Sequence, residues 1–427
     1  MMHALVVAPL LLSLVGAPTE EHLDLDRLVE LAKAQHPRLG EARAVARARE
    51  AEAKSARGRL LPAIALHDEL QHYTSPFDIS FGGGSFQARG QDTNLFVASA
   101  TQPLLGLGAR IERYRAAEAG AGASTERLSS AEAALTESLR IAYLELFEAR
   151  ALEDIAAASK AELEEQRAVA EAKVKAGALT RADRLRVEVA AANAEQQRIE
   201  AGASVATARA QLLTAVGLSP EAPVALEEPT ALLARGEAPP PLYDAAQAQA
   251  LEARPELSAL EGERAAAEHK SDAAWWDLLP EVDVEAAYVR TDGQAFAPKD
   301  QAYVGLAANW RVFEWGAGWY AREASEAAAE AASASLEAAH RALYAELAQR
   351  LARLRASQGA VAVAQTAIAS AEEAFRVTRE AVDVGAATTT DLLDAESALT
   401  QARLRLTHAR YAAAIARVQL DRAMGVD

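Results

Sequence analysis

The chain contains one unit of sequence twice, and this duplication restricts its possible folds more than any other feature. Residues 173–218 align without a gap with residues 381–426, and the matched positions include glycine, threonine, aspartate and arginine. A second block agrees, because HPRLGEARAVA at 36–46 pairs with RPELSALEGER at 254–264. Self-similarity on this scale indicates that one structural unit is built twice.

The limits of the two copies follow from composition. The Pro-rich stretch 219–241 is typical of a linker, so we expect a first structural repeat over 20–218 and a second over 242–427. Residues 1–19 hold an apolar run followed by Gly and Ala, which resembles a secretory signal peptide, although no Lys or Arg precedes the run. The sequence therefore predicts an exported protein.

A short turn, AGALTRAD in the first copy and VGAATTTD in the second, divides the helical part of each repeat. The glycine can take the left-handed conformation that ends a helix, the threonine can cap the next helix, and the aspartate completes a T-x-x-D capping box. The residues in these roles are Gly177, Thr180 and Asp183 in one copy and Gly385, Thr388 and Asp391 in the other. We therefore predict two helical hairpins with their tips at one end, opposite the strands.

The helical stretches are long and carry heptads. Each copy is expected to begin with one helix, roughly 24–60 and 242–278. The segment 111–176 lacks proline and would form a helix roughly 100 Å long. Beyond each turn, small and apolar residues recur at spacings of three and four, which is typical of coiled coils. These positions are Leu185, Val189, Ala192, Gln196, Ile199, Ala203, Ala206, Ala210 and Leu213, and Leu392, Ala395, Leu399, Ala402, Leu406, Ala409, Ala413, Ala416 and Leu420.

Two strand-like segments follow the first helix of each copy, each close to the ~9–11 residues of a tilted membrane-spanning strand. Four strands cannot close a barrel, and lipid does not tolerate open sheet edges, so closure requires several chains. The alternating positions are Ile64, Leu66 and Leu70, then Leu95, Val97 and Ser99 after a glycine-rich loop, then Val282, Val284, Ala286 and Tyr288, and last Ala302, Val304, Leu306, Ala308 and Trp310.

The tryptophans are concentrated around the strands of the second copy. All five fall in one short part of the chain, so an up-and-back hairpin would gather them near one of its ends. Such a group fits an aromatic girdle at a bilayer interface, and a Trp-rich core cluster is the alternative. The residues are Trp275, Trp276, Trp310, Trp315 and Trp319.

Composition excludes several functions. The net charge of −17 argues against a nucleic-acid partner, which needs a basic face. Without cysteine the chain has no disulfide, no thiolate site and no lipid anchor on cysteine. The eight histidines include no pair at helical ligand spacing, so we expect neither a metal site nor a cofactor. No nucleophile elbow or phosphate loop is present, which argues against an enzyme.

The duplicated unit resembles the TolC-like outer-membrane efflux proteins. The resemblance lies in the order of the segments and in the run G-x-x-T-x-x-D-L-L-x-A-E-x-x-L after the second turn. QPLLGLGARIERYRAA at 102–117 and RVFEWGAG at 311–318 are similar to the family's strand-to-helix junctions. The matching residues of the run are Gly385, Thr388, Asp391, Leu392, Leu393, Ala395, Glu396 and Leu399.

The resemblance implies a mainly α fold with a small β part. A homotrimer would form a long coiled-coil α-helical barrel in the periplasm, and four β-strands per chain would contribute to a transmembrane β-barrel in the outer membrane of a Gram-negative bacterium. The implied function is a passive exit duct of a tripartite efflux or type I secretion system. Its hairpin tips would dock a periplasmic adaptor joined to an inner-membrane pump of RND, ABC or MFS type. The tip residues are Gly177, Ala178, Leu179, Thr180, Gly385, Ala386, Ala387 and Thr388.

Two acidic residues and one departure from the family concern the entrance. In the family the acidic pair aligned with Asp391 and Asp394 lines the narrow periplasmic opening, where a ring of carboxylates would select cations. Helix capping explains Asp391 equally well, since Asp183 matches it. Val382 and Ala387 stand where the family's latch has an aromatic residue and an arginine, so Arg181 and Asp383 are the candidates to replace that latch.

Two other functions share part of this pattern. A periplasmic adaptor is also built on a helical hairpin, but it would carry one hairpin and a small β-rich module rather than a full duplication. A coiled-coil scaffold protein of an export system would explain the heptads but neither the strands nor the placement of tryptophan.

Overall fold

The computed structural model describes residues 21–426, so the predicted signal peptide lies outside the described residues. The chain divides into two compact units. The hairpin unit comprises the described parts of Met1–Pro37, Glu132–Gln249 and Glu346–Asp427, and the strand unit comprises Arg38–Ala131 and Ala250–Ala345. Each sequence repeat contributes to both units, and the helices at 107–175 and 317–383 have residues in both.

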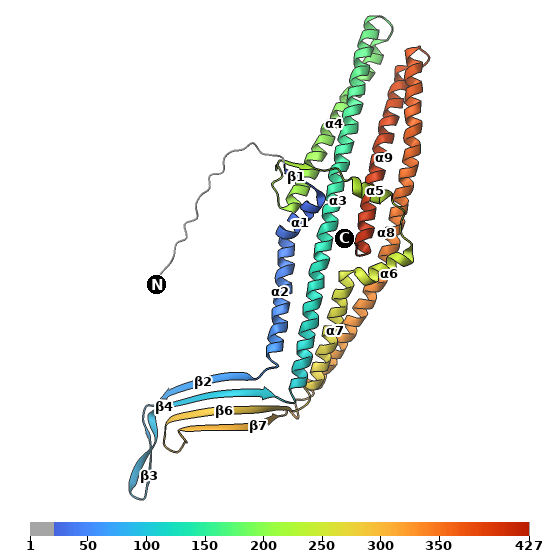
Figure 1. The fold of residues 1–427 in the computed structure, drawn as a ribbon. Coiled ribbons are helices and arrows are strands. Elements are labelled where there is room, and N and C mark those ends of the chain that lie inside the picture. The colour runs from blue at the N-terminus through green and yellow to red at the C-terminus, as the bar shows by residue number, and fades with distance from the viewer. Residues whose placement is uncertain (1–20, 427) are drawn as a thin grey trace. The chain divides into compact units, whose positions relative to one another are not determined.

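Four long helices dominate the chain (Figure 1). They are α3 (Leu107–Lys175), α4 (Arg181–Val216), α8 (Ala317–Asp383) and α9 (Thr389–Ala423). The 69 residues of α3 confirm the long proline-free helix, since they correspond to roughly 100 Å at 1.5 Å per residue. Within residues 21–426, no helix combines the length and the apolar character that crossing a membrane requires.

The first helix of each copy is broken, and the prediction of one continuous helix was wrong. A proline stands after the break in both copies. It lacks a backbone N–H and forces the preceding residue out of the helical region. His36 has ψ 123° and Arg254 has ψ 116°. The resulting pairs are α1 (Leu25–Gln35) with α2 (Pro37–Gly58) and α6 (Tyr243–Ala253) with α7 (Pro255–Trp276).

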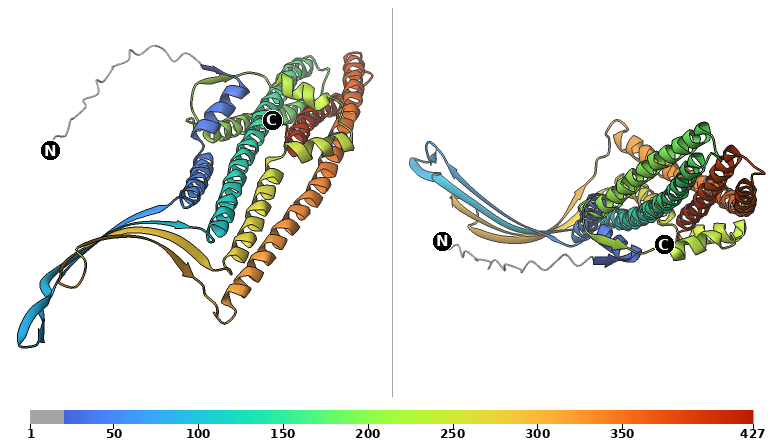
Figure 2. Two further views of the ribbon diagram at one scale, coloured as in Figure 1. Left: turned by 60° about the horizontal axis from the view of Figure 1, so that its bottom comes forward. Right: turned by 90° about the horizontal axis from the view of Figure 1, so that it is seen from above.

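The strand unit holds one antiparallel sheet in the order β2-β4-β6-β7, so the pairing of β4 with β6 joins the two repeats. The four predicted strands are present, and the glycine-rich loop adds a fifth, β3, that pairs with the start of β4. Both views in Figure 2 show the four strands side by side in one curved layer. The strands are β2 (Ala63–His72), β3 (Phe77–Phe81), β4 (Gly84–Pro103), β6 (Glu281–Gln294) and β7 (Asp300–Asn309).

The two faces of this sheet differ in polarity. The register aligns Ile64 with Ala100, Ala100 with Ala286, and Ala286 with Val304, so these side chains share one face. Ile64 is 81% exposed and Val304 77% exposed, although both are apolar. His67 and Glu69 point to the opposite face because successive residues of a strand alternate. At this level of the sheet one face is therefore apolar, and no residue among 21–426 covers Ile64 or Val304.

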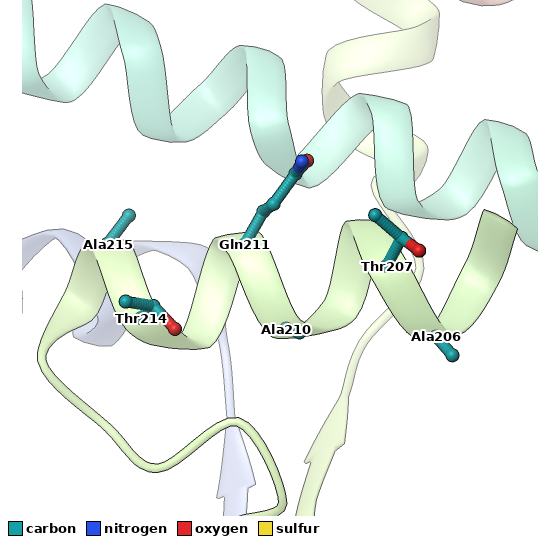
Figure 3. Close-up of a pocket in the computed structure, with 6 residues that line it drawn as sticks. All are labelled: Ala206, Thr207, Ala210, Gln211, Thr214 and Ala215. Carbon is teal, nitrogen blue, oxygen red and sulfur yellow. The ribbon is translucent and has the colours of Figure 1, made fainter. Parts of the chain in front are cut away.

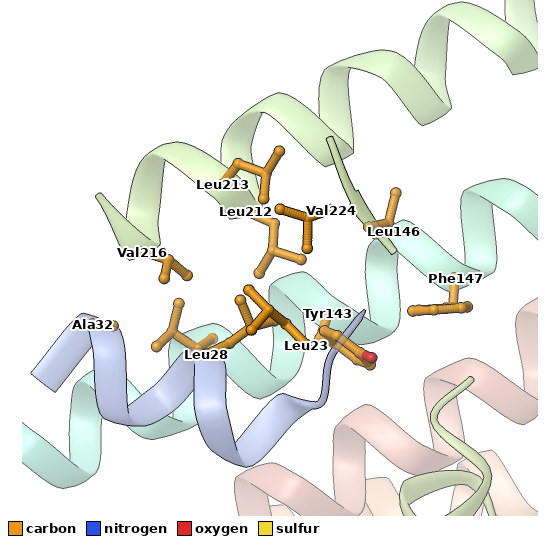
Figure 4. Packing of buried hydrophobic residues seen from close by; sticks show 11 residues of the cluster. Leu23, Leu28, Ala32, Tyr143, Leu146, Phe147, Leu212, Leu213, Val216 and Val224 are labelled. Atoms are coloured by element: carbon orange, nitrogen blue, oxygen red, sulfur yellow. The ribbon is translucent and has the colours of Figure 1, made fainter. Parts of the chain in front are cut away.

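The main core of the hairpin unit joins α1, α3 and α4 to two short strands (Figure 4). β1 (Glu21–Leu23) pairs in parallel with β5 (Val224–Leu226). The hydroxyl of Tyr143 donates a hydrogen bond to the carbonyl of Glu227, and burial raises the pKa of Tyr143 to about 12. The buried residues are Leu23, Leu28, Ala32, Leu139, Tyr143, Leu146, Phe147, Leu212, Leu213, Val216 and Val224.

The predicted linker is folded against this unit. Besides β5 it contains α5 (Thr230–Glu237), which packs on α9. Arg235 forms an ion pair with Asp421 at 2.8 Å, and Gln358 donates to the carbonyl of Gly236 at 2.9 Å. A Cβ atom on Gly236 would lie 2.7 Å from the backbone of Ala414. The linker thus packs tightly on α9, and the lack of a side chain at Gly236 lets the backbones of α5 and α9 approach closely.

Replacing Gly236 with alanine is expected to destabilise the protein by about 1–3 kcal/mol, because the new methyl group meets rigid backbone. Thermal unfolding of detergent-purified protein, followed by circular dichroism, would show a lower transition temperature. Gly359→Ala is the control, since a Cβ there would have nothing within 4 Å. Equal transition temperatures for the two variants would contradict the close contact.

The predicted coiled-coil seams have different environments in the two copies. In α9 the seam is inside the chain, where Leu399, Ala413 and Leu420 are buried. In α4 the seam is exposed from Leu185 to Ala206, where Val189 and Ile199 are 60% and 57% accessible, and it becomes buried only at Leu213. Another face of α4 is buried in its place, through Val187, Ala191 and Ala194. Figure 3 shows a hollow on the surface lined only by α4 residues, including Ala206 and Ala210 of the seam.

Candidate site at the helical hairpin tips

The two predicted turns have the same backbone geometry. Gly177 and Gly385 adopt φ of 72° and 76°, the left-handed region that glycine favours. Ala178 N–H donates to the carbonyl of Lys173 at 2.8 Å, and Ala386 N–H donates to that of Ala381 at 2.7 Å. These hydrogen bonds satisfy carbonyl groups of the last helical turn, which have no partner within the helix. Each long helix therefore ends where the sequence predicts.

Both following helices begin with a complete capping box. Thr180 and Thr388 are the N-caps, and each accepts a hydrogen bond at 3.2 Å from the aspartate N–H three residues later. The aspartate carboxylate in turn accepts from the threonine hydroxyl at 2.6 Å. Duplicated sequence thus gives duplicated tips.

These hydrogen bonds hold the pKa of Asp183 and of Asp391 below the usual value, with the threonine hydroxyl as the largest cause in both. A carboxyl whose pKa is lowered by folding adds stability above its unfolded pKa and loses that contribution as pH falls through the folded value. The capping boxes therefore add stability at neutral pH, and this contribution is lost as pH falls below the usual pKa of aspartate.

The tips offer small side chains to solvent. Among the predicted tip residues, Leu179 and Ala387 are half-buried, and Gly177, Ala178, Thr180, Gly385, Ala386 and Thr388 are exposed. A surface of glycine, alanine and threonine lets another backbone approach closely. Whether these residues contact an adaptor stays a prediction.

Polar contacts join the two hairpins just behind the tips. Lys173 of α3 lies 3.6 Å from Asp383 of α8, and Arg186 of α4 donates to the hydroxyl of Thr390 at 3.1 Å. Asp383 is thus paired with Lys173 rather than with Arg181. Val382, at the position of the family's latch aromatic, lines a cleft of about 250 Å³ between the hairpins.

Further contacts join the hairpins at a greater distance from the tips. Arg379 of α8 reaches Glu162 and Glu165 of α3 at 3.5 and 3.9 Å. Ser159 donates a 2.6 Å hydrogen bond to Glu396, and both side chains are buried. A buried carboxylate that loses its donor is costly, so this bond fixes α9 against α3.

The two acids of the predicted constriction differ in their local contacts. The carboxylate of Asp391 is engaged in its capping box, where Thr388 N–H donates at 2.8 Å. Asp394, one turn later, is exposed and contacts no hydrogen-bonding or charged partner among residues 21–426. Helix capping therefore accounts for Asp391, whereas the carboxylate of Asp394 is free to interact with a passing ion.

The tryptophans lie at the strand-to-helix junction of the strand unit. Pairing of Glu281 with Asn309 places the two ends of the β6–β7 hairpin together. Trp310 Nε1 donates to the carbonyl of Leu278 at 3.3 Å, and Trp276 packs so closely on Gly108 that a Cβ there would lie 2.5 Å from the ring. Trp275, Trp310, Trp315 and Trp319 are exposed. Their placement at a bilayer interface stays a prediction.

Comparison with known proteins gives one family match and several similar folds. The model of the outer membrane efflux protein family matches residues 28–218 and 247–426. A search of curated protein sequences finds no match.

Solved structures agree with the family match. The chain is 19% identical to the outer membrane protein VceC of Vibrio cholerae, with a TM-score of 0.81 over 94% of this chain and 96% of that one. The chain is 16% identical to CusC, with a TM-score of 0.82 over 97% of this chain and 96% of that one. It is 19% identical to the MtrE outer membrane channel of Neisseria gonorrhoeae, with a TM-score of 0.76 over 94% of this chain and 89% of that one. At these identities the likeness shows a shared fold.

Proposed function

Because the chain belongs to the outer membrane efflux protein family, and is thus an exit duct of an efflux system, we propose that three copies form one continuous duct. The duct docks a periplasmic adaptor through its hairpin tips and has no catalytic role. The observation that carries the proposal is a pair of mainly apolar heptad stripes, at 185–206 of α4 and on α8, that residues 21–426 of one chain leave exposed.

The stripe on α4 is the predicted seam described above. A second stripe, on α8, has the same spacing of four and three residues and is exposed except for one half-buried alanine. Its positions are Ala356, Ala360, Val363, Ala367, Ser370, Ala374, Val377 and Ala381. Sustained seven-residue spacing favours packing against another helix. Each of these two helices therefore has one stripe without a packing partner among residues 21–426.

The presence of two different stripes on one chain favours assembly of several copies into a closed ring. If the α4 stripe of one copy packs on the α8 stripe of the next, the contact is heterologous, and only a closed ring leaves no stripe uncovered. The sheet has the same property, because β2 and β7 are its two free edges. Pairing β7 of one copy with β2 of the next would remove the open edges that lipid does not tolerate.

The two sheet faces fit a wall between lipid and water. The apolar face with Ile64 and Val304 would meet lipid, and the face with His67 and Glu69 would line the duct. We infer that Trp275, Trp276, Trp310, Trp315 and Trp319 then mark the bilayer interface. The helices would extend the duct into the periplasm. There the carboxylates of Asp394 from the three copies would favour the passage of cations over anions.

Purification tests the proposal directly. Detergent-extracted protein should have the mass of three chains by light scattering, migrate faster on a gel when unheated, and conduct ions in planar bilayers. A monodisperse monomer that stays soluble without detergent would refute it. The adaptor contact is tested separately, by cysteine cross-linking from Ala178 and Ala386 to a co-expressed adaptor.

A further inference from the structure

Three side chains in the strand unit converge although the sequence separates them widely. Among the described residues, Glu112 of α3 and His269 and Asp272 of α7 each offer one ligand atom, and these atoms lie within 4.8 Å of one another. Nδ1 of His269 is 2.7 Å from Oε2 of Glu112. The cluster therefore joins two helices through groups that ligate metals.

The arrangement has the features of a helix-pair metal site. His269 and Asp272 are three residues apart, so they lie on one helix face. Glu112 comes from the facing helix, and its second oxygen, Oε1, is held at 2.7 Å by Arg115. A carboxylate whose other oxygen is bound is fixed in orientation, as ligands in metal sites usually are.

Burial and charge also suit a cation. The side chain of Glu112 is only 12% exposed and that of His269 is 32% exposed, whereas Asp272 is open to solvent and gives a route of access. Asp272 has no hydrogen-bonding or charged partner within residues 21–426. Its carboxylate is therefore free to ligate an ion beside His269 and Glu112.

We propose that Glu112, His269 and Asp272 bind a divalent transition-metal ion of the Zn²⁺ type. Imidazole with two carboxylates is a borderline donor set that favours such ions over Mg²⁺ or Ca²⁺. The histidine binds as neutral imidazole, with a proton released if it was charged, and water completes a four-coordinate ion. The ion would join α3 to α7. This inference is independent of the trimer and of the cargo.

Zinc titration by calorimetry tests the site on tag-free, chelator-treated protein in detergent. Asp272→Asn and His269→Ala should each lower Zn²⁺ affinity by about tenfold or more. Asp272→Asn is the decisive variant, because this carboxylate makes no contact that folding needs. His408→Ala is the matched control, since His408 pairs with Glu148 at 2.6 Å and no third ligand atom joins them among the described residues.

The inference holds if both site variants lose affinity while His408→Ala binds as the wild type does. Zinc should then also raise the unfolding temperature of the wild type but not of Asp272→Asn. Unchanged affinity in Asp272→Asn would overturn the inference, because the cluster would then be only a hydrogen bond between α3 and α7. Equal losses in the His408 variant would also overturn it, as they would indicate non-specific binding.

Discussion

Replacing Val189 and Ile199 together with aspartate is expected to convert the proposed trimer to monomers. Both side chains belong to the α4 stripe and are more than half exposed in the single chain. Burying such a side chain contributes about 1.5–3 kcal/mol, and this is lost twice in each interface. The new carboxylates would also be buried without a cation, which is strongly destabilising. Light scattering in detergent should report single-chain mass.

The control for this experiment keeps the stripe apolar. Val189→Ile with Ile199→Leu should leave the trimer intact, because hydrophobic replacements of similar size are tolerated. If the aspartate variant stays trimeric with unchanged heat stability, the α4 stripe faces something other than a second copy and the ring is wrong. The family assignment would survive that result, since it does not depend on which helices meet.

The local features of the fold could be predicted from sequence because they depend on neighbouring residues. Gly177 and Gly385 end their helices as expected, and Thr180 and Thr388 cap the next ones. The break after His36 was equally readable, since the residue before a proline is biased away from the helical region. The prediction missed it because it did not apply this rule to Pro37 and Pro255.

Packing partners could not be predicted in the same way. Heptad spacing requires a neighbouring helix but does not say whether that helix belongs to the same chain. The seam of α9 meets helices of its own chain, whereas positions 185–206 of the α4 seam stay exposed, because Val187, Ala191 and Ala194 supply the apolar face that is buried there. A helix with two such faces is expected in the wall of a barrel, where each helix has a neighbour on both sides.

The candidate site was predictable in its turns but not in its cross-contacts. The pair Lys173–Asp383 joins α3 to α8, and Glu112 meets His269 across 157 positions of the chain. Searching for two histidines at helical spacing missed the second case, because one ligand comes from a distant helix. The signal that could have found it is the His-x-x-Asp pair at 269 and 272.

The second large effect concerns ion selectivity. Asp394→Asn is expected to lower the cation-to-anion permeability ratio roughly severalfold, because a ring of three free carboxylates around one axis would be removed. The substitution keeps the size of the side chain, and Asp394 makes no contact that folding needs. Reversal potentials under a KCl gradient in planar bilayers measure the ratio.

Asp391→Asn should have a smaller effect on the ratio. Its carboxylate already accepts hydrogen bonds from Thr388 and lies at the positive end of α9, so part of its field is neutralised. Asp183→Asn is the matched control, because Asp183 makes the same capping box in the first repeat, where Arg186 stands in place of the second acid. A ratio that falls in Asp391→Asn but not in Asp394→Asn would reverse the assignment. A ratio unchanged in both would place the selective part of the duct away from this turn.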